Sequence, residues 1–187
     1  MVQSRTLLQE LSDNKNFIDF NVSALSFDSR EIDYGNIFFA LKGNKQDGRD
    51  FISEAKSRGA KLILCEENIQ DTSVIQVDNL RDYMGKVASR FYGDPSRKLK
   101  TFCVTGTNGK TSCVESLAKL AYNLGSNCGY LSTIGVSLDG INVIRDSELT
   151  TPDSIYLQKT LAEILDNGSK FVALEASSHG LAQKRLS

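Results

Sequence analysis

Residues 104–111 (VTGTNGKT) form the segment that most constrains this chain, because they lie between two regular patterns of apolar residues. Residues 100–105 predict a buried strand, and residues 111–124 predict a helix, with Gly125 as its stop. A strand that leads through a tight loop into a helix begins a βαβ unit. We therefore expect an α/β fold with a parallel sheet and crossover helices.

The same segment has the composition of a phosphate-binding loop. The first N–H groups of a helix have no partner within the helix and attract anions. Gly106 and Gly109 would let the backbone approach phosphate oxygens closely. Lys110 would bring a positive charge to the phosphates, and Thr111 would offer a hydroxyl to Mg²⁺. The spacing is not a full GxxxxGK(S/T) pattern, because Val104 stands where the first glycine would fall.

The alternation of strands and helices extends over the rest of the chain and suggests two domains. Turn-forming residues at 92–96 place the boundary near residue 95, which gives a mixed α/β domain at 1–95 and the phosphate-loop domain at 96–187. The first domain should contain helices at 5–11, 51–58 and 80–91, extended segments at 23–28, 36–41, 61–65 and 74–77, and a loop at 42–50. The second should add strands at 127–132 and 171–175, a hairpin at 134–144, a helix at 153–165 and a polar loop at 176–180.

Composition argues against several classes of protein. Lys plus Arg number 22 and Asp plus Glu 23, so the net charge is −1, whereas a general nucleic-acid binder would be basic. No apolar run approaches the ~20 residues of a membrane span, and the polar N-terminus lacks the apolar core of a signal peptide. We expect a cytoplasmic protein with no membrane partner. Its cysteines lack metal-ligand or disulfide spacing, so we interpret them as reduced packing residues: Cys65, Cys103, Cys113 and Cys128.

Five separated segments together resemble the Mur ligase family, the ATP-dependent ligases that extend the peptide stem of peptidoglycan. They stand in the order and rough spacing of the family: 28–30 (DSR), 43–49 (GNKQDGR), 105–111 (TGTNGKT), 150–152 (TTP) and 175–181 (EASSHGL). The resemblance implies a UDP-binding domain at 1–95, followed by the first half of a P-loop-type parallel-sheet ATPase domain at 96–187. It also implies ATP and Mg²⁺ as cofactors.

The site residues of the family carry over to matching positions of this sequence. The resemblance implies that Lys110 and Glu175 are catalytic and that Thr111 and Glu175 hold Mg²⁺. It implies ATP binding by Gly106, Thr107, Asn108, Gly109, Lys110, Thr111 and Ser112. It implies binding of the UDP-sugar dipeptide by Phe27, Ser29, Asn44, Lys45, Gln46, Thr150, Thr151, Ser177, Gln183 and Arg185. The single histidine, His179, would line the site without serving as a general base.

The residues alone leave structural alternatives open at several of these positions. Residues 44–46 fit an ordinary surface turn, and the 28–30 segment fits a local ion pair between its charged residues. Thr150 and Thr151 also fit the N-cap region of a helix. Glu175 ends a hydrophobic strand, where a carboxylate points into the crevice in which open α/β sheets bind ligands.

The reaction that the resemblance implies is amide ligation. ATP would phosphorylate the side-chain carboxylate of D-glutamate in UDP-MurNAc-L-alanyl-D-glutamate, and the amine of a third amino acid would attack the acyl phosphate. The residues leave open whether that amino acid is meso-diaminopimelate or L-lysine. Lys110, Mg²⁺ and the helix N-terminus would neutralise the developing charge, so no protein nucleophile is needed.

The resemblance also implies that family members continue past the position of Ser187, into the rest of the ATPase domain and a domain that binds the amino acid. We therefore expect this chain alone not to complete ligation, and its sheet to end with an unpaired edge at 171–175 unless other strands cover it. Two alternatives remain open. A folylpolyglutamate synthetase-like ligase shares the phosphate loop but lacks the domain that precedes it here. A non-catalytic nucleotide-sugar binding protein would keep the first domain and a vestigial loop.

Overall fold

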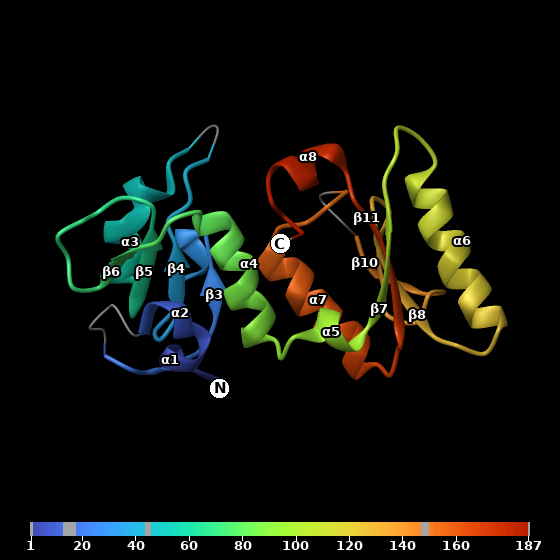
Figure 1. Cartoon of the computed structure of the whole chain (residues 1–187), viewed down its shortest axis with the longest axis horizontal. Coiled ribbons are helices and arrows are strands. Elements are labelled where there is room, and N and C mark those ends of the chain that lie inside the picture. The colour runs from blue at the N-terminus through green and yellow to red at the C-terminus, as the bar shows by residue number, and fades with distance from the viewer. Residues whose placement is uncertain (1, 13–17, 44–45, 147–149, 187) are drawn as a thin grey trace. The chain divides into compact units, whose positions relative to one another are not determined.

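The computed structural model describes residues 2–12, 18–43, 46–146 and 150–186. The chain forms two compact units, Met1–Val87 and Ala88–Ser187, and each has its own sheet and hydrophobic core (Figure 1). The division falls inside helix α4 (Leu80–Phe91), whereas the turn signals place the domain boundary near residue 95. Within the described ranges, no helix combines the length and hydropathy that a membrane span requires.

The first unit is built on a four-stranded parallel sheet whose strand order follows the sequence. The strands are β3 (Leu25–Ser26), β4 (Ile37–Phe39), β5 (Leu62–Cys65) and β6 (Val74–Gln76). Residues of these strands pack with α3 (Ile52–Ser57) into one core, which includes Phe38, Ala55 and Ile63. A separate antiparallel pair joins β1 (Val2–Gln3) to β2 (Asn21–Val22). The strands predicted at 36–41, 61–65 and 74–77, and the helices at 51–58 and 80–91, are confirmed.

Two segments of the first unit differ from the prediction. The helix expected at 5–11 is divided into α1 (Ser4–Leu7) and α2 (Gln9–Ser12), because Leu8 leaves the helical conformation with φ −105° and ψ 34°. The loop expected at 42–50 ends in a 3₁₀ helix, η2 (Gly48–Phe51). This helix forms because the Asp47 carboxylate accepts a hydrogen bond from the Arg49 N–H at 3.0 Å and so caps the turn.

The second unit contains a five-stranded sheet in the order β10-β9-β8-β11-β7. Three strands are parallel: β7 (Lys100–Val104), β8 (Cys128–Ser132) and β11 (Phe171–Glu175). The predicted hairpin is confirmed as the antiparallel pair β9 (Gly135–Ser137) and β10 (Val143–Arg145). Figure 1 shows α6 (Lys110–Asn123) and α7 (Ser154–Asp166) on opposite faces of the sheet, as crossover helices should lie.

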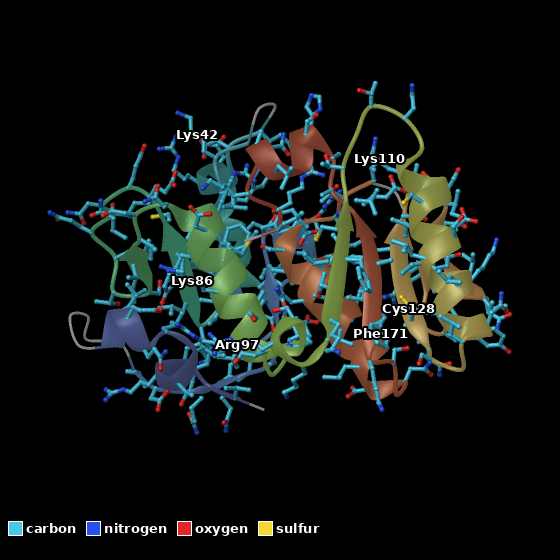
Figure 2. The ribbon with its side chains drawn as sticks, turned by 45° about the vertical axis from the view of Figure 1, so that its right-hand side comes forward. Lys42, Lys86, Arg97, Lys110, Cys128 and Phe171 are labelled. Atoms are coloured by element: carbon cyan, nitrogen blue, oxygen red, sulfur yellow. The ribbon has the colours of Figure 1, made fainter. Side chains whose placement is uncertain are left out.

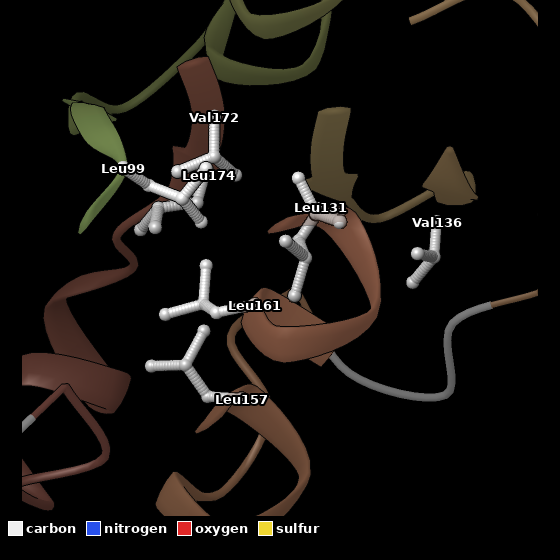
Figure 3. Packing of buried hydrophobic residues seen from close by; sticks show 8 residues of the cluster. Leu99, Leu131, Val136, Leu157, Leu161, Val172 and Leu174 are labelled. Atoms are coloured by element: carbon white, nitrogen blue, oxygen red, sulfur yellow. The ribbon is translucent and has the colours of Figure 1, made fainter. Parts of the chain in front are cut away.

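Alternate residues of β11 pack on opposite faces of this sheet and so contribute to both halves of the hydrophobic core of the second unit. Val172 and Leu174 pack with Leu157 and Leu161 of α7, which point toward them in Figure 3. Ala173 lies on the other face and packs against α6 residues such as Val114 and Ala118. Burial on both faces explains why β11 reads as a continuous apolar run rather than an alternating one.

The expected unpaired edge at β11 is wrong. β11 lies in the centre of the sheet, hydrogen-bonded to β7 on one side and β8 on the other. The crossover from β7 through α6 to β8 skips one strand position, and β11 enters that position later in the chain. Among the described strands β7 is therefore one edge of the sheet and β10 the other, so the strand before the predicted phosphate loop is not buried as predicted, and Phe102 is 45% exposed.

The packing role predicted for the cysteines holds for only two of them. All four thiols are free, as expected, and Cys65 and Cys128 are buried. Cys103 and Cys113 are exposed, because Cys103 lies on the edge strand and Cys113 lies on a turn of α6 that faces away from the sheet core.

Two segments predicted as turns contain short helices instead. Helix α5 (Pro95–Lys98) starts at a proline, whose fixed φ angle suits the first position of a helix. Helix α8 (Ser178–Ala182) occupies most of the expected polar loop, because the Ser177 hydroxyl accepts a hydrogen bond from the Gly180 N–H at 3.0 Å and caps it.

Candidate functional site

Three strand ends of the second unit meet at the carboxyl edge of its parallel sheet. Val104 pairs with Glu175 at the end of β7 and β11, and Leu131 pairs with Leu174 beside them. The Ala176 N–H donates to the Val104 carbonyl at 2.9 Å, so the pairing continues to the first residue of the phosphate loop. The amino ends of β8 and β11, labelled Cys128 and Phe171 in Figure 2, lie at the opposite end of the sheet from Lys110. Open α/β sheets bind ligands at this carboxyl edge.

The predicted phosphate loop has the backbone that its glycines permit. Gly106 has φ +148° and Gly109 has φ +79°, both in the region that side chains disfavour. A Cβ on Gly109 would meet no atom within 4 Å, so its backbone conformation, and not crowding, requires glycine there. Helix α6 begins directly after it without a side-chain cap, which leaves its first N–H groups available to an anion.

Lys110 lies across the loop in this structure. Its Nζ donates to the Gly106 carbonyl at 2.9 Å and to the Thr107 carbonyl at 3.5 Å. Figure 2 labels Lys110 where the loop enters α6. The ammonium group is therefore held by the same segment whose N–H groups would bind phosphate, and Thr111 follows it on the first turn of α6.

Glu175 is a buried carboxylate, with 2% of the residue exposed. Its Oε1 accepts from the Thr133 N–H at 2.8 Å, and its Oε2 accepts from the Thr133 hydroxyl at 3.2 Å. In the described part of the chain, no lysine or arginine forms an ion pair with Glu175. A buried carboxylate that meets only neutral donors is suited to receive a cation.

The oxygen donors at Glu175 suit a Mg²⁺ ion that also binds water and phosphates. They do not form a site in which protein side chains alone enclose a metal. The ranges that the structure covers contain no group of three or more His, Cys, Asp or Glu side chains that could hold a metal. Mg²⁺ commonly binds one or two protein oxygens together with water and substrate phosphates. Glu175 and the Thr111 hydroxyl, on either side of a phosphate loop, are donors of this type.

The predicted dipeptide-binding residues of the second unit lie together beside Glu175. The Thr151 hydroxyl donates to the Glu175 carbonyl at 2.9 Å and accepts from the Ser177 N–H at 2.9 Å. Arg185 Nη1 donates to the Thr151 carbonyl at 2.7 Å, and Gln183 Oε1 accepts from Arg185 Nε and Nη2 at 3.0 and 2.7 Å. The N-cap of α7 is Asp153, so Thr151 is not the helix cap that the residues alone allowed.

The residues predicted to bind UDP occupy two turns of the first unit. Phe27 is 42% exposed, and Ser29 is buried on η1 (Ser29–Glu31), where its hydroxyl donates to Glu54 Oε2 at 2.7 Å. Gln46 is exposed, whereas Asn44 and Lys45 lie outside the described residues.

Charged side chains support both turns. Arg30 and Asp28 form the local ion pair that the 28–30 segment allowed, at 2.6 Å. Arg49 pairs with Asp47 and with Glu67, and the Arg49 guanidinium beside Asp47 lowers the pKa of that carboxyl to about 2. A backbone bridge between Lys42 and Asp47 closes the loop that carries Gln46.

Sequence reasoning missed two residues that contact predicted site residues. Thr133 binds the Glu175 carboxylate, and Glu54 accepts the Ser29 hydroxyl. Thr133 directly follows a buried strand, and the rule that selected Glu175 could have selected it. Glu54 has no comparable signal, because it lies within a short amphipathic helix.

Two family models match this chain and together cover most of it. The model described as Mur ligase middle domain matches residues 104–187, and the model described as Mur ligase family, catalytic domain, matches residues 21–92. The chain belongs to the Mur ligase family. The first match starts at the end of β7, and it therefore contains the loop, Thr133, Glu175 and the Thr151 network.

Named relatives within the Mur ligase family are similar over nearly the whole chain. The UDP-N-acetylmuramoyl-L-alanyl-D-glutamate--2,6-diaminopimelate ligase of Coxiella burnetii is 38% identical over 188 aligned residues, which cover 96% of this chain and 38% of that protein. The ligase of the same name from Pseudomonas putida is 40% identical over 171 residues, which cover 88% of this chain and 34% of that protein. The chain thus spans roughly a third to two fifths of the length of these relatives.

Solved structures of Mur ligases share the fold. A structure of UDP-N-acetylmuramoyl-L-alanyl-D-glutamate--2,6-diaminopimelate ligase superposes with a TM-score of 0.81 at 28% identity, and the match covers 99% of this chain and 38% of that one. The MurF ligase of Thermotoga maritima in complex with ADP has a TM-score of 0.55 at 24% identity, over 83% of this chain and 32% of that one.

Proposed function

We propose that this chain supplies the UDP-sugar site and much of the ATP site of a ligase that adds a third amino acid to UDP-MurNAc-L-alanyl-D-glutamate. The observation that carries the proposal is the juxtaposition, at one sheet edge, of the glycine loop that precedes Lys110 and the buried Glu175 carboxylate, whose described partners are the neutral donors of Thr133. The names of the relatives favour 2,6-diaminopimelate over lysine as the amino acid added.

The phosphate loop would bind and orient the ATP phosphates. The open N–H groups at the start of α6 would bind phosphate oxygens, and Lys110 would leave the Gly106 carbonyl to pair with them. In-line transfer of a phosphoryl group requires this neutralisation more than it requires a protein nucleophile. The acyl phosphate of the D-glutamate side chain would then react with the incoming amine, with release of phosphate.

Glu175 and Thr111 are the residues that would hold Mg²⁺. When bound, the ion would neutralise charge on the phosphate oxygens. The protein's own part is to keep the Glu175 carboxylate in place, and Thr133 and the strand pairing of β11 do so.

The dipeptide end of the substrate would bind at the Thr151 network. Arg185 is held by Gln183 and by the Thr151 carbonyl, so its guanidinium is already oriented before ligand binds. A guanidinium of this kind suits a carboxylate of the muramoyl dipeptide. The uridine end would bind at Ser29 and Phe27 of the first unit.

Calorimetric titration of the 187-residue chain with MgATP, and separately with UDP-MurNAc-L-alanyl-D-glutamate, tests the proposal. We expect both ligands to bind. Lys110→Ala should weaken MgATP binding by roughly 10–100-fold, because a hydrogen bond to a charged group contributes ~1.5–3 kcal/mol. It should leave the UDP-sugar affinity unchanged.

Lys119→Ala is the matched control, because Lys119 lies on the same helix and pairs with Glu115 at its surface, at 3.5 Å. Equal MgATP affinity in the Lys110 and Lys119 variants would contradict the proposed ATP site. Binding of the UDP-sugar without any MgATP binding would instead support the non-catalytic nucleotide-sugar binding protein.

A further inference from the structure

We propose that Thr133 is a positioning residue that connects the metal ligand Glu175 to the substrate-binding residue Thr150. The inference rests on the proposed function, because it takes Glu175 as a Mg²⁺ ligand and Thr150 as a dipeptide contact. The inference adds Thr133, which is in neither the sequence motifs nor the set of site residues that the family implies. It also gives a direction to the hydrogen bonds of the site.

The direction follows from the chemistry of the three groups. A carboxylate only accepts hydrogen bonds, so the single hydroxyl hydrogen of Thr133 is donated to Glu175 Oε2. Thr133 Oγ1 also lies 3.2 Å from Thr150 Oγ1, and because one hydroxyl has a single hydrogen, Thr150 is the donor between them when Thr133 donates to Glu175. The hydroxyls therefore form a one-way chain from Thr150 through Thr133 to Glu175.

This chain fixes both ends of the site. Thr133 holds each oxygen of the Glu175 carboxylate with a separate group, the N–H on Oε1 and the hydroxyl on Oε2, so the plane of the carboxylate is set. When Thr150 donates its hydrogen to Thr133, its oxygen keeps the lone pairs of a hydroxyl and could accept from a ligand. An amide N–H of the muramoyl dipeptide has the matching chemistry.

A purely structural role does not explain these contacts. Thr133 is exposed and lies just beyond the end of β8, whose last residue, Ser132, pairs with Gly135 of β9. The Glu175 carboxylate beneath it is buried. Partners that orient a metal-binding carboxylate from behind are as much a part of the site as the ligand itself, and their loss typically costs 10–100-fold in metal affinity.

The test compares Thr133→Val with Thr133→Ser in the full chain. Valine keeps the shape and the N–H bond to Oε1 but removes the hydroxyl, whereas serine keeps both donors. Thr101→Val is the control, because Thr101 is an exposed threonine on β7 of the same unit. Four quantities are measured for each variant. Two concern the ATP analogue, which is non-hydrolysable: the Mg²⁺ concentration that gives half-maximal binding, and the affinity without Mg²⁺. The others are the affinity for UDP-MurNAc-L-alanyl-D-glutamate and the urea midpoint of unfolding.

We expect Thr133→Val to raise the half-maximal Mg²⁺ concentration about 10-fold or more, and to weaken the UDP-sugar affinity in the same variant. The affinity for the ATP analogue without Mg²⁺, and the urea midpoint of unfolding, should stay at the values of the unsubstituted chain. Thr133→Ser and Thr101→Val should behave like the unsubstituted chain in all measurements.

The outcomes separate this inference from the proposed function. If the unsubstituted chain shows no Mg²⁺-dependent binding of the analogue, the proposed function fails. If it shows that dependence and Thr133→Val leaves the dependence unchanged, the positioning role of Thr133 is wrong. If Thr133→Val lowers the urea midpoint, Thr133→Ser and Thr133→Ala are compared instead. A merely structural role would lower the stability of the Thr133→Ala variant without changing the Mg²⁺ concentration needed for binding, and that result would contradict the positioning role.

Discussion

Single residues of the site are constrained by what lies next to them as much as by their own chemistry. Gly180 illustrates this at the start of α8. A Cβ at this position would lie 2.7 Å from Thr151 Cβ and Cγ2, and 3.0 Å from the Ser177 hydroxyl. Thr151 is itself buried and hydrogen-bonded to Glu175, so it cannot move aside freely. Only a residue without a side chain allows α8 to approach the Thr151 network.

Gly180→Ala should therefore lower both stability and substrate affinity. Overpacking against a buried neighbour costs about 1–3 kcal/mol, which a urea titration would measure as a lower midpoint. Displacement of Thr151 should also weaken binding of UDP-MurNAc-L-alanyl-D-glutamate. Ser178→Ala on the same short helix is the control and should change neither quantity. Full stability in the Gly180 variant would show that α8 packs less closely than described.

At the scale of elements, helix α7 joins the site to the core of the second unit. Its buried face packs on β11 through Leu157, Leu161 and Ile164, and its N-terminus follows directly on Thr151. The helix begins at Asp153, whose Oδ1 accepts from the N–H groups of Ile155 and Tyr156 at 2.9 and 3.0 Å. Burial raises the pKa of Asp153, and these two N–H donors partly offset that effect.

Asp153→Ala should destabilise the second unit by ~1 kcal/mol, the usual cost of losing an N-cap. Asp153→Asn should cost less, because asparagine is also a strong N-cap residue and its side-chain oxygen can accept the same bonds. Urea unfolding followed by circular dichroism would compare the two variants. Equal losses of stability in Asp153→Ala and Asp153→Asn would mean that Asp153 stabilises the unit through its charge and not through the N-cap hydrogen bonds.

The reactivity of the cysteines tests whether β7 lies at an exposed edge of the sheet. Burial raises the pKa of the Cys128 thiol to about 11, and Cys128 and Cys65 are both enclosed by the two cores. Burial raises the pKa of Cys103 as well, so access to the thiol decides the reaction: the native chain should react with Ellman's reagent at the exposed Cys103 and Cys113 only, and at all four thiols in urea. Cys103→Ser should remove one native equivalent. A native chain in which Cys103 is protected would contradict the position of β7 at the edge.

The pH dependence of stability belongs to the scale of the whole molecule, because both units contain carboxyls whose pKa is lowered, although the pKa of Asp153 is raised. Arg30 lowers the pKa of Asp28, and Arg49 lowers the pKa of Asp47 to about 2. Lys56 and Ser73 hold the pKa of Asp71 well below its usual range. Burial by itself would raise the pKa of Asp139, but hydrogen bonds from Asn142, Ile141 and Ser137 bring it well below its usual range.

These shifts predict a loss of stability in acid. A carboxyl whose pKa is lower in the folded chain than the ~3.9 of the unfolded chain stabilises the fold above that value. The contribution is lost as the pH falls through the folded pKa, so the urea midpoint should be level near neutral pH and fall from about pH 4 to about pH 2. Asp47→Asn should show a smaller fall over this range. A urea midpoint that rises as the pH falls from 4 to 2 would contradict the predicted direction of the pH dependence.

Local patterns of residues predicted the individual helices and strands. The helix at 80–91 and the strand at 171–175 were predictable with the bounds observed, because apolar spacing and capping residues act within one element. The passage from strand through a glycine loop into a helix around residues 104–111 was predictable from one short segment, and its binding of phosphate stays a prediction. The motifs named five substrate residues of the second unit, and the structure shows that these residues are neighbours. The contacts between them could not be predicted from the motifs.

Only the tertiary structure decided which strand lies at the edge and which residues surround Glu175. Strand order depends on pairing between segments far apart in the chain, and no local pattern records that β11 enters between β7 and β8. The contact of Thr133 with Glu175 spans 42 residues and exists only because β8 and β11 pair in parallel and end together. Periodicity is a property of neighbours in sequence, whereas the site is made by neighbours in space.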